Sequence, residues 1–268
     1  MLLHPVPPGA ALDLAALPTT PPAGTPKGEE LEAATARLLG RLETLQATLL
    51  AEGRRALLVV LQARDTGGKD GTIRKVLGAC SPQGLRVTSF ARPTEIELAH
   101  DFLWRVHREV PARGMVGVFN RSHYEDVLAV RVRSLVPEAV WRPRFQQIND
   151  FERLLTESGT TVVKLFLNIS REEQAERLRA RLHDPEKNWK FEEGDIEDRA
   201  HWDLYTAAYE EAITRCSTPD APWYVVPADK KKARDFLVAQ ILVETLERMR
   251  PRYPRADERV LALLERIV

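Results

Sequence analysis

Apolar and polar positions follow one another along the chain in blocks that predict helices and strands in turn. Leu31, Leu38, Leu42 and Leu45 recur at helical spacing, which predicts a helix over residues 28–51. The run 57–61 is apolar without alternation, as is typical of a parallel strand covered on both faces. The same reasoning predicts strands at 85–90, 115–119, 161–169 and 223–226, and helices at 69–79, 95–109, 141–157, 170–183, 196–215, 230–248 and 255–268. Because strands and helices alternate throughout, we expect an α/β fold with a parallel five-stranded sheet and helices on both faces.

Two stretches interrupt this pattern. Residues 1–27 are rich in proline, which predicts an extended segment that lies over the surface or is partly mobile. Residues 184–199 are polar and lie between two predicted helices, which indicates a mobile insertion. No repeat and no linker divides the remainder, so residues 28–268 are expected to form one domain behind the N-terminal extension.

The composition excludes few functions, but it bears on the cellular location of the protein and on the kinds of partner it binds. Lys+Arg and Asp+Glu both number 39 in 268 residues, so no overall charge points to nucleic acid or to a membrane surface as a partner. No apolar run reaches the roughly 20 residues that span a bilayer, and the N-terminus does not resemble a signal peptide. Cys80 and Cys216 stand in no metal-binding spacing, which favours buried, reduced thiols. We therefore expect a cytoplasmic protein that binds neither nucleic acid nor a membrane.

The candidate chemistry begins directly after the first strand. Gly67, Gly68 and Gly71 lack a Cβ, so the backbone can approach a phosphate closely, and Lys69 adds a positive charge. A strand, a glycine-rich turn and a helix in this order are typical of a phosphate-binding P-loop. The match to G-x-x-x-x-G-K-[S/T] is incomplete, because Ala63 replaces the first glycine and an aspartate replaces the last hydroxyl. An ordinary strand-to-helix turn is the alternative.

A second polar group follows the third strand. Asn120 stands where P-loop enzymes carry a metal-holding aspartate, and Arg121 can clamp phosphoryl oxygens with its planar fork. Glu125, Asp126 and Asp65 supply carboxylates for a metal ion. A polar cap on a strand end is the alternative interpretation. We interpret His123 as a hydrogen-bonding residue rather than a catalytic base.

Three further groups lie outside these two loops. Arg177 and Arg181 are four residues apart on one helix face, which suggests a lid over phosphates or, equally, a solvated surface. Trp189 and the nearby Phe191 are expected in the core rather than stacked on a base. The lysine run 230–232 is expected to be solvated at a helix start.

Six short motifs occur in an order that resembles the polyphosphate kinase 2 family. They are DTGGKDG at 65–71, RPT at 92–94, HDFLWR at 100–105, FNRSHYE at 119–125, NWK at 188–190 and APW at 221–223. The resemblance covers roughly residues 30–250. It implies a thymidylate-kinase-like P-loop fold with a helical lid at about 171–200. It also implies reversible transfer of a terminal phosphoryl group between inorganic polyphosphate and AMP, ADP or ATP, with Mg²⁺ or Mn²⁺.

The resemblance also implies roles for individual residues. The catalytic residues would be Asp65, Lys69, Arg121 and Arg181, and the metal ligands Asp65 and Glu125. Nucleotide or phosphate binding would involve Thr66, Gly67, Gly68, Lys69, Asp70, Gly71, Lys75, Asn120, Arg121, Arg131, Arg133 and Arg177. Asparagine at 120, with Glu125, resembles the branch that phosphorylates both nucleoside mono- and diphosphates. The family further implies a homo-oligomer, either a dimer or a tetramer.

Two other functions remain compatible with the residues alone. The chain could be a nucleoside monophosphate kinase that uses ATP as the donor, since the same fold serves both reactions. It could also bind nucleotide or polyphosphate without turnover, given that Ala63 and Asn120 depart from the usual patterns.

Overall fold

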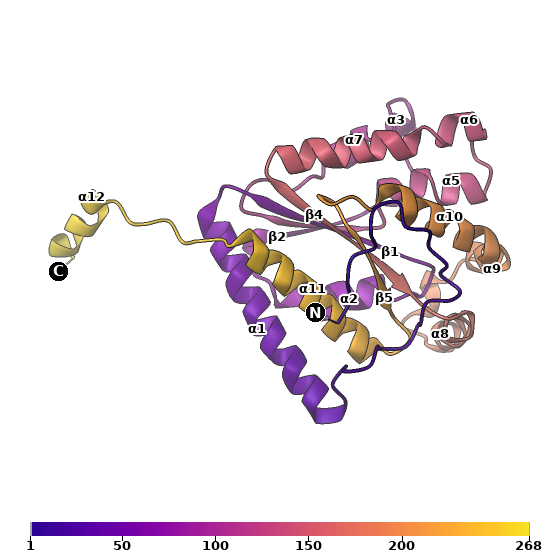
Figure 1. The fold of residues 1–268 in the computed structure, drawn as a ribbon, viewed down its shortest axis with the longest axis horizontal. Coiled ribbons are helices and arrows are strands. Elements are labelled where there is room, and N and C mark those ends of the chain that lie inside the picture. Colours follow the sequence, from indigo (N-terminus) through magenta and orange to yellow (C-terminus); the bar gives the residue numbers. More distant parts are fainter. Residues whose placement is uncertain (1, 268) are drawn as a thin grey trace.

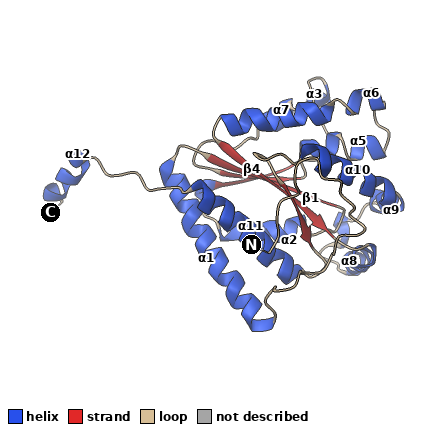
Figure 2. Ribbon diagram, in the orientation of Figure 1, coloured by secondary structure: helices blue, strands red, loops and turns tan. Residues whose placement is uncertain are grey.

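The computed structural model describes residues 2–267 and is built on one parallel sheet. Its strands are β1 (Ala56–Ala63), β2 (Leu85–Ser89), β3 (Val116–Asn120), β4 (Thr160–Asn168) and β5 (Trp223–Pro227). They lie in the order β2-β3-β1-β4-β5, with every pair parallel (Figure 2). Each residue of the central strand β1 is buried, which explains its unbroken apolar run. The predicted α/β fold with five parallel strands is confirmed.

Helices cover both faces of this sheet (Figure 1). On one face α1 (Gly28–Glu52) and α11 (Lys231–Met249) pack together, and α2 (Lys69–Lys75) lies beside them. On the other face lie α7 (Arg144–Glu157) and α10 (Trp202–Cys216). Leu57, Val59 and Leu61 of β1 join the first core, whereas Leu58 and Val60 join the second. Residues of β1 therefore alternate between two hydrophobic layers.

The lid region is more ordered than the sequence suggests. It consists of α8 (Arg171–His183), a 3₁₀ turn (Asn188–Lys190) and α9 (Glu193–Ala200). Part of the insertion predicted at 184–199 is helical, because Glu192 and Asp195 form a reciprocal capping box that starts α9, and its predicted mobility stays a prediction. The single helix predicted from 196 is divided at His201, where α9 ends and α10 begins. Trp189 is 73% exposed, so its predicted core position is also wrong.

Other predicted helices are shorter than expected. The segment 95–109 forms α3 (Glu95–Leu98) and α4 (Trp104–His107), because the Asp101 carboxylate accepts a hydrogen bond from Leu103 N at 3.0 Å between them. The P-loop helix α2 ends at Lys75, followed by a 3₁₀ turn (Leu77–Ala79). Pro143 separates α6 (Glu138–Trp141) from α7. Two other short elements are α5 (Ala129–Val132) and a 3₁₀ turn (His123–Asp126).

The proline-rich N-terminal segment lies across the edge strand β5 (Figure 1). Val6 N donates to Trp223 O at 2.8 Å, and Ser217 Oγ donates to Val6 O at 2.6 Å. Leu14 is buried in the second core. Thr19 Oγ1 donates to Asp229 Oδ2 at 2.6 Å. The predicted packing of this extension over the surface is confirmed.

The C-terminal segment leaves the body of the molecule. Beyond α11 the chain forms α12 (Glu258–Leu261) and a 3₁₀ helix (Ala262–Arg266), which stand apart from the rest in Figure 1. Within residues 2–267, no helix is both long and apolar enough to cross a lipid bilayer. The thiols of Cys80 and Cys216 are buried and free, as expected, and burial raises the pKa of each to about 12.

Candidate active site

The loop after β1 has the tight geometry that its glycines predict. A Cβ added to Gly67 would lie 2.6 Å from the Cβ of Ala63 and 2.8 Å from Arg64 O. Gly68 has φ +104°, a left-handed conformation that side chains with a Cβ rarely adopt. Thr66 also has a positive φ, of 59°. The loop is thus closed so sharply that its backbone, rather than side chains, lines its inner surface.

An arginine from the far end of the sequence packs against this loop. A Cβ on Gly68 would lie only 1.9 Å from Arg234 Nη1, and one on Gly71 would lie 3.3 Å from Arg234 Nη2. Arg234 is 2% exposed and is held by Asp235, whose Oδ1 accepts from Nε at 2.9 Å and from Nη2 at 2.6 Å. The guanidinium therefore reaches the loop from the first turn of α11. Sequence reasoning missed Arg234, because a helical arginine carries no local sign of such a contact.

Lys69 lies at the start of α2 and points back along the loop. Its Nζ donates to Ala63 O at 3.0 Å. Burial and the neighbouring charge of Arg121 lower the pKa of Lys69, although three carboxylates nearby oppose that shift. Relief of this repulsion by an anion would be favourable, so the loop is suited to bind one.

The loop after β3 brings a second cation to the same place. Arg121 has φ 60°, and its Nη2 donates to Asp65 Oδ1 at 2.9 Å. Glu125 and, less strongly, Asp65 raise the pKa of Arg121, against the effect of burial. Asn120 Nδ2 donates to Asp70 Oδ1 at 2.9 Å. Two of the departures from the P-loop pattern, Asn120 and Asp70, are therefore hydrogen-bonded to each other.

A buried polar cluster supports this loop from behind. Lys164, with no exposed surface, donates to Glu152 and to Tyr124 Oη, the latter at 2.9 Å. His123 Nε2 lies 3.2 Å from Glu152 Oε1. Burial raises the pKa of Glu152, but Lys164 and His123 outweigh it, and the net pKa lies below the usual range. His123 is thus a buried hydrogen-bonding residue, as the sequence reasoning held.

The two lid arginines predicted on one helix face have different surroundings. Arg177 is buried, and its Nη1 donates to Thr66 O at 3.0 Å while Nη2 donates to Ala228 O and Asp229 O. It therefore fastens α8 to the P-loop and to the start of α11. Arg181 is more exposed, and its Nη1 lies 3.4 Å from Asp195 Oδ2 on α9. Of the two, Arg181 can be released more easily toward a ligand.

A cavity of about 720 Å³ unites these groups at the carboxyl ends of the strands. The predicted residues among its lining are Asp65, Thr66, Gly67, Gly68, Lys69, Asp70, Gly71, Asn120, Arg121, Arg177 and Arg181. Seven further charged residues that the sequence reasoning did not assign also line it, namely Arg74, Asp184, Lys187, Glu192, Asp195, Lys231 and Arg234. Lys231 is exposed, as expected for a solvated lysine at a helix start, and it also lines this cavity. Cationic side chains thus surround the loop from α2, α8 and α11.

A smaller cavity adjoins the first one. Asp65, Arg121 and Glu125 line it, together with Asp198 and Tyr205 from the lid side. Within the described residues, no three His, Cys, Asp or Glu side chains converge closely enough to cage a metal. Mg²⁺ bound with a phosphate needs only one or two carboxylates, since water and phosphate oxygens complete its shell. The carboxylates of Asp65 and Glu125 fit that requirement.

Two residues that line the main cavity each carry a buried side-chain oxygen without a hydrogen-bond partner in the part of the chain that is described. These oxygens are Thr66 Oγ1 and Asn120 Oδ1. A buried oxygen that lacks a donor is costly unless a ligand, metal or water supplies one. Both are consistent with a site that is completed by a bound group.

Three predicted phosphate-binding residues do not line the main cavity. Arg131 pairs with Glu211 at 2.6 Å, and Arg133 pairs with Asp198 of α9 at 2.8 Å. Lys75 lies on α2 near Asp235. Their predicted contacts with polyphosphate or nucleotide stay predictions.

The parallel sheet, the glycine-rich loop at its carboxyl edge and the cationic cavity define a P-loop kinase-like protein. Residues 26–254 match the family model described as polyphosphate kinase 2. The chain belongs to the polyphosphate kinase 2 family.

Individual relatives agree with this assignment. An AMP/ADP-polyphosphate phosphotransferase of Meiothermus ruber is 57% identical over 84% of this chain and 84% of its own length. An ADP-polyphosphate phosphotransferase of Rhodopseudomonas palustris is 47% identical over 80% of this chain and 78% of its own length. The crystal structure of polyphosphate kinase 2 from Arthrobacter aurescens superimposes with a TM-score of 0.89 at 45% identity, and covers 98% of this chain and 95% of that one.

Proposed function

We propose that this protein transfers the terminal phosphoryl group of inorganic polyphosphate to AMP and to ADP, and catalyses the reverse reaction. The names of the two relatives described above support both acceptors. The Asn120 side chain supports the same proposal, because it stands where the branch that uses mono- and diphosphates differs from the rest of the family.

The observation that carries the proposal is the extent of positive charge around the cavity. Lys69 and Arg121 suffice for the phosphates of a nucleotide, yet Arg74, Lys231 and Arg234 line the same cavity. A polyanion must be neutralised along its length before its end can approach an anionic acceptor. Eight cationic side chains and five carboxylates line the cavity, and this excess of positive charge is what a polyphosphate chain requires.

The transfer itself needs positioning and charge rather than a covalent enzyme intermediate. An oxygen of the acceptor's terminal phosphate attacks the last phosphorus of the chain, and the bond to the bridging oxygen breaks. The acceptor gains one phosphate and the polyphosphate leaves one unit shorter. Lys69 and Arg121 would stabilise the charge that spreads over the equatorial oxygens. Asp65 would hold Arg121 in place through their 2.9 Å contact.

Mg²⁺ or Mn²⁺ would be held by Asp65 and Glu125, the carboxylates beside Arg121. When bound, the ion would supply positive charge that neutralises the phosphate oxygens. The lid, residues 171–200, would close over the substrates. Arg181 would then exchange its 3.4 Å contact with Asp195 for the transferring phosphoryl group.

The test supplies purified protein, Mg²⁺ and polyphosphate with AMP or ADP alone, and follows the nucleotides by anion-exchange chromatography. We expect ADP and ATP to form from AMP, and ATP from ADP. The variant Lys69→Ala should retain the fold, checked by circular dichroism, and lose turnover. The absence of any product with polyphosphate, together with turnover of AMP when ATP is the donor, would overturn the proposal. Tight binding of polyphosphate with no turnover of any donor would overturn it as well.

A further inference from the structure

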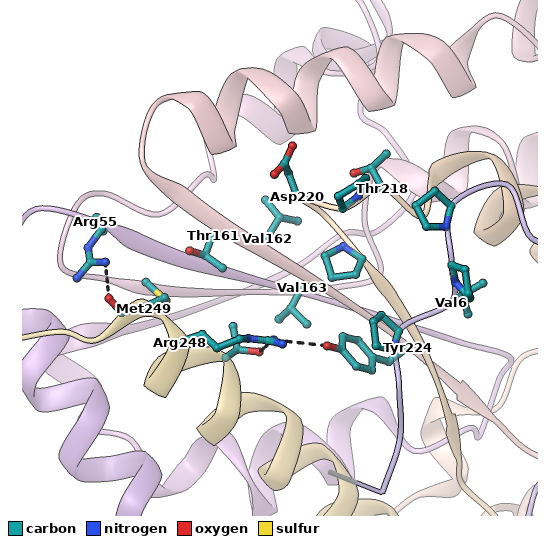
Figure 3. A pocket seen from close by; sticks show the side chains of 16 residues that line it. Val6, Arg55, Thr161, Val162, Val163, Thr218, Asp220, Tyr224, Arg248 and Met249 are labelled. Atoms are coloured by element: carbon teal, nitrogen blue, oxygen red, sulfur yellow. Dashed lines mark hydrogen bonds between the residues drawn. The ribbon is translucent and has the colours of Figure 1, made fainter.

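The middle of β4 carries a lysine, Lys164, whose side chain has no exposed surface. Successive side chains of this strand point to opposite sides of the sheet, as Val162 and Val163 do in Figure 3. Lys164 lies on the same side as Val162, in the layer that α7 covers. There its Nζ donates to Glu152 of α7, which is 1% exposed. The molecule thus buries an ion pair in a layer that is otherwise mainly apolar.

The hydrogen bonds of this pair are complete. Lys164 Nζ also donates to Tyr124 Oη at 2.9 Å and to Cys216 O at 2.6 Å, which uses all three donors of the ammonium group. Glu152 Oε1 accepts from Tyr124 Oη at 2.9 Å and lies 3.2 Å from His123 Nε2. Tyr124 and His123 are fully buried as well. A buried polar network that is satisfied in this way rigidifies the groups that it joins.

The stability of the fold alone does not explain the pair. The cost of removing two charges from water is comparable to what their attraction returns, so well-packed apolar residues of similar volume often serve equally well. The surroundings would suit such residues, since the ring of Trp223 lies beside Lys164 and that of Phe151 lies beside His123. The function of the pair is therefore to be found in the segment that it holds.

That segment is the loop after β3, at the edge of the phosphate-binding cavity. His123 and Tyr124 begin the 3₁₀ turn that closely follows Arg121. Arg121 has φ 60°, a conformation that a residue with a side chain retains only where its surroundings impose it. Ser122 is fully extended, and its Oγ accepts from Tyr124 N at 3.2 Å. Fixed side chains at 123 and 124 thus constrain the backbone from which the Arg121 guanidinium extends.

We propose that Glu152 and Lys164 are positioning residues for phosphoryl transfer, which act through His123 and Tyr124 to hold Arg121 toward the transferred group. Neither member of the pair lines the cavity, so neither touches a substrate. The role rests on the proposed function, in which Arg121 stabilises the charge on the phosphoryl oxygens. A misplacement of about 1 Å far from the chemistry can lower a rate by about 10²-fold.

A double-mutant cycle with Arg121 tests this role. The variant Glu152→Leu, Lys164→Met replaces both charges by apolar side chains, so no charge is left buried alone. We expect its kcat to fall by about 10²-fold, with the KM for AMP within about threefold of wild type. In an Arg121→Ala background the same replacement should lower kcat by less than about threefold, because the residue through which the pair acts is already absent.

The matched control is Leu165→Ala, on the opposite side of the same strand. It removes buried apolar volume, so its urea midpoint should fall at least as far as that of the double variant, yet kcat should stay within about twofold of wild type. Tyr124→Phe is a second, milder variant in case the double replacement does not fold. It keeps the ring and removes only the hydroxyl that joins Lys164 to Glu152, and it should lower kcat about tenfold, again only while Arg121 is present.

Two results would overturn the positioning role. One is a wild-type kcat in the variants that fold. The other is a loss of kcat that is equally large with and without the Arg121 side chain, because a pair that serves only the fold would act independently of Arg121. Each assay is run with polyphosphate and separately with ATP as the donor. Failure of the polyphosphate assignment would then appear as a wild-type chain that is active with ATP alone, in which case the cycle is read with ATP. A wild-type chain that turns over neither donor would overturn both proposals.

Discussion

Replacing Gly68 with alanine should destabilise the protein severely, although the added group is a single methyl. Alanine at φ +104° costs of order 1–3 kcal/mol in backbone strain. The new Cβ would also lie 1.9 Å from Arg234 Nη1, so this guanidinium must move. Moving it weakens the two hydrogen bonds to Asp235, and hydrogen bonds to charged groups contribute about 1.5–3 kcal/mol. The free energy of unfolding should therefore fall by about 3–6 kcal/mol, a large share of the 5–15 kcal/mol that is typical of a folded protein.

Urea unfolding followed by circular dichroism measures this loss. Gly40→Ala is the control, because Gly40 lies within α1 with no atom inside 4 Å of an added Cβ. It should stabilise the protein by about 0.5–1 kcal/mol. In an Arg234→Gln background the new Cβ no longer clashes with a guanidinium. There, Gly68→Ala should lower the free energy of unfolding only by the backbone strain, about 1–3 kcal/mol. If Gly68→Ala unfolds within about 1 kcal/mol of wild type, the close approach of Arg234 to the loop is refuted.

Three other outcomes follow from the site and its surroundings. Arg181→Ala should lower kcat more than it raises the KM for nucleotide, because its contact forms on lid closure; steady-state kinetics that show a rise in KM alone would argue for ground-state binding. Asp65→Asn and Glu125→Gln should each raise the Mg²⁺ concentration needed for half-maximal activity, and unchanged metal titrations in both would contradict their role as ligands. Burial raises the pKa of Asp126 to about 6 despite the nearby Arg144, so its contribution to stability is present below pH 4 and lost as pH rises through 6. Relative to wild type, Asp126→Asn should therefore gain about 3 kcal/mol of unfolding free energy between pH 4 and pH 8, whereas a constant difference in urea unfolding would contradict the shift.

The sequence predicted the sheet and the loop because both depend on local chemistry. The unbroken apolar run of β1 follows from burial on two faces, and the glycines at 67 and 68 follow from a turn with no space for side chains. Both features are therefore visible in a short stretch of sequence. The resemblance in six motifs then supplied the family, which no single motif would have indicated.

What escaped prediction depends on contacts between distant segments. Arg234 meets Gly68 only because α11 packs beside α2. Arg177 donates to three backbone carbonyls, contacts that the sequence did not indicate, and its predicted phosphate binding stays a prediction. The break at His201 likewise has no counterpart in the helical spacing of the sequence. The spacing of apolar residues along the sequence carries no information about such contacts between distant segments.

The N-terminal segment reaches the lid through one carboxylate. Thr19 donates to Asp229 Oδ2, while Asp229 Oδ1 accepts from Ser170 N at 2.8 Å, at the residue that caps α8. The backbone oxygen of Asp229 also accepts from Arg177. A chain shortened to begin at Gly28 would keep the whole P-loop and yet lose the hydroxyl that holds Asp229. Through Asp229, the proline-rich extension is thus linked to the first residue of the lid, although it precedes the first helix.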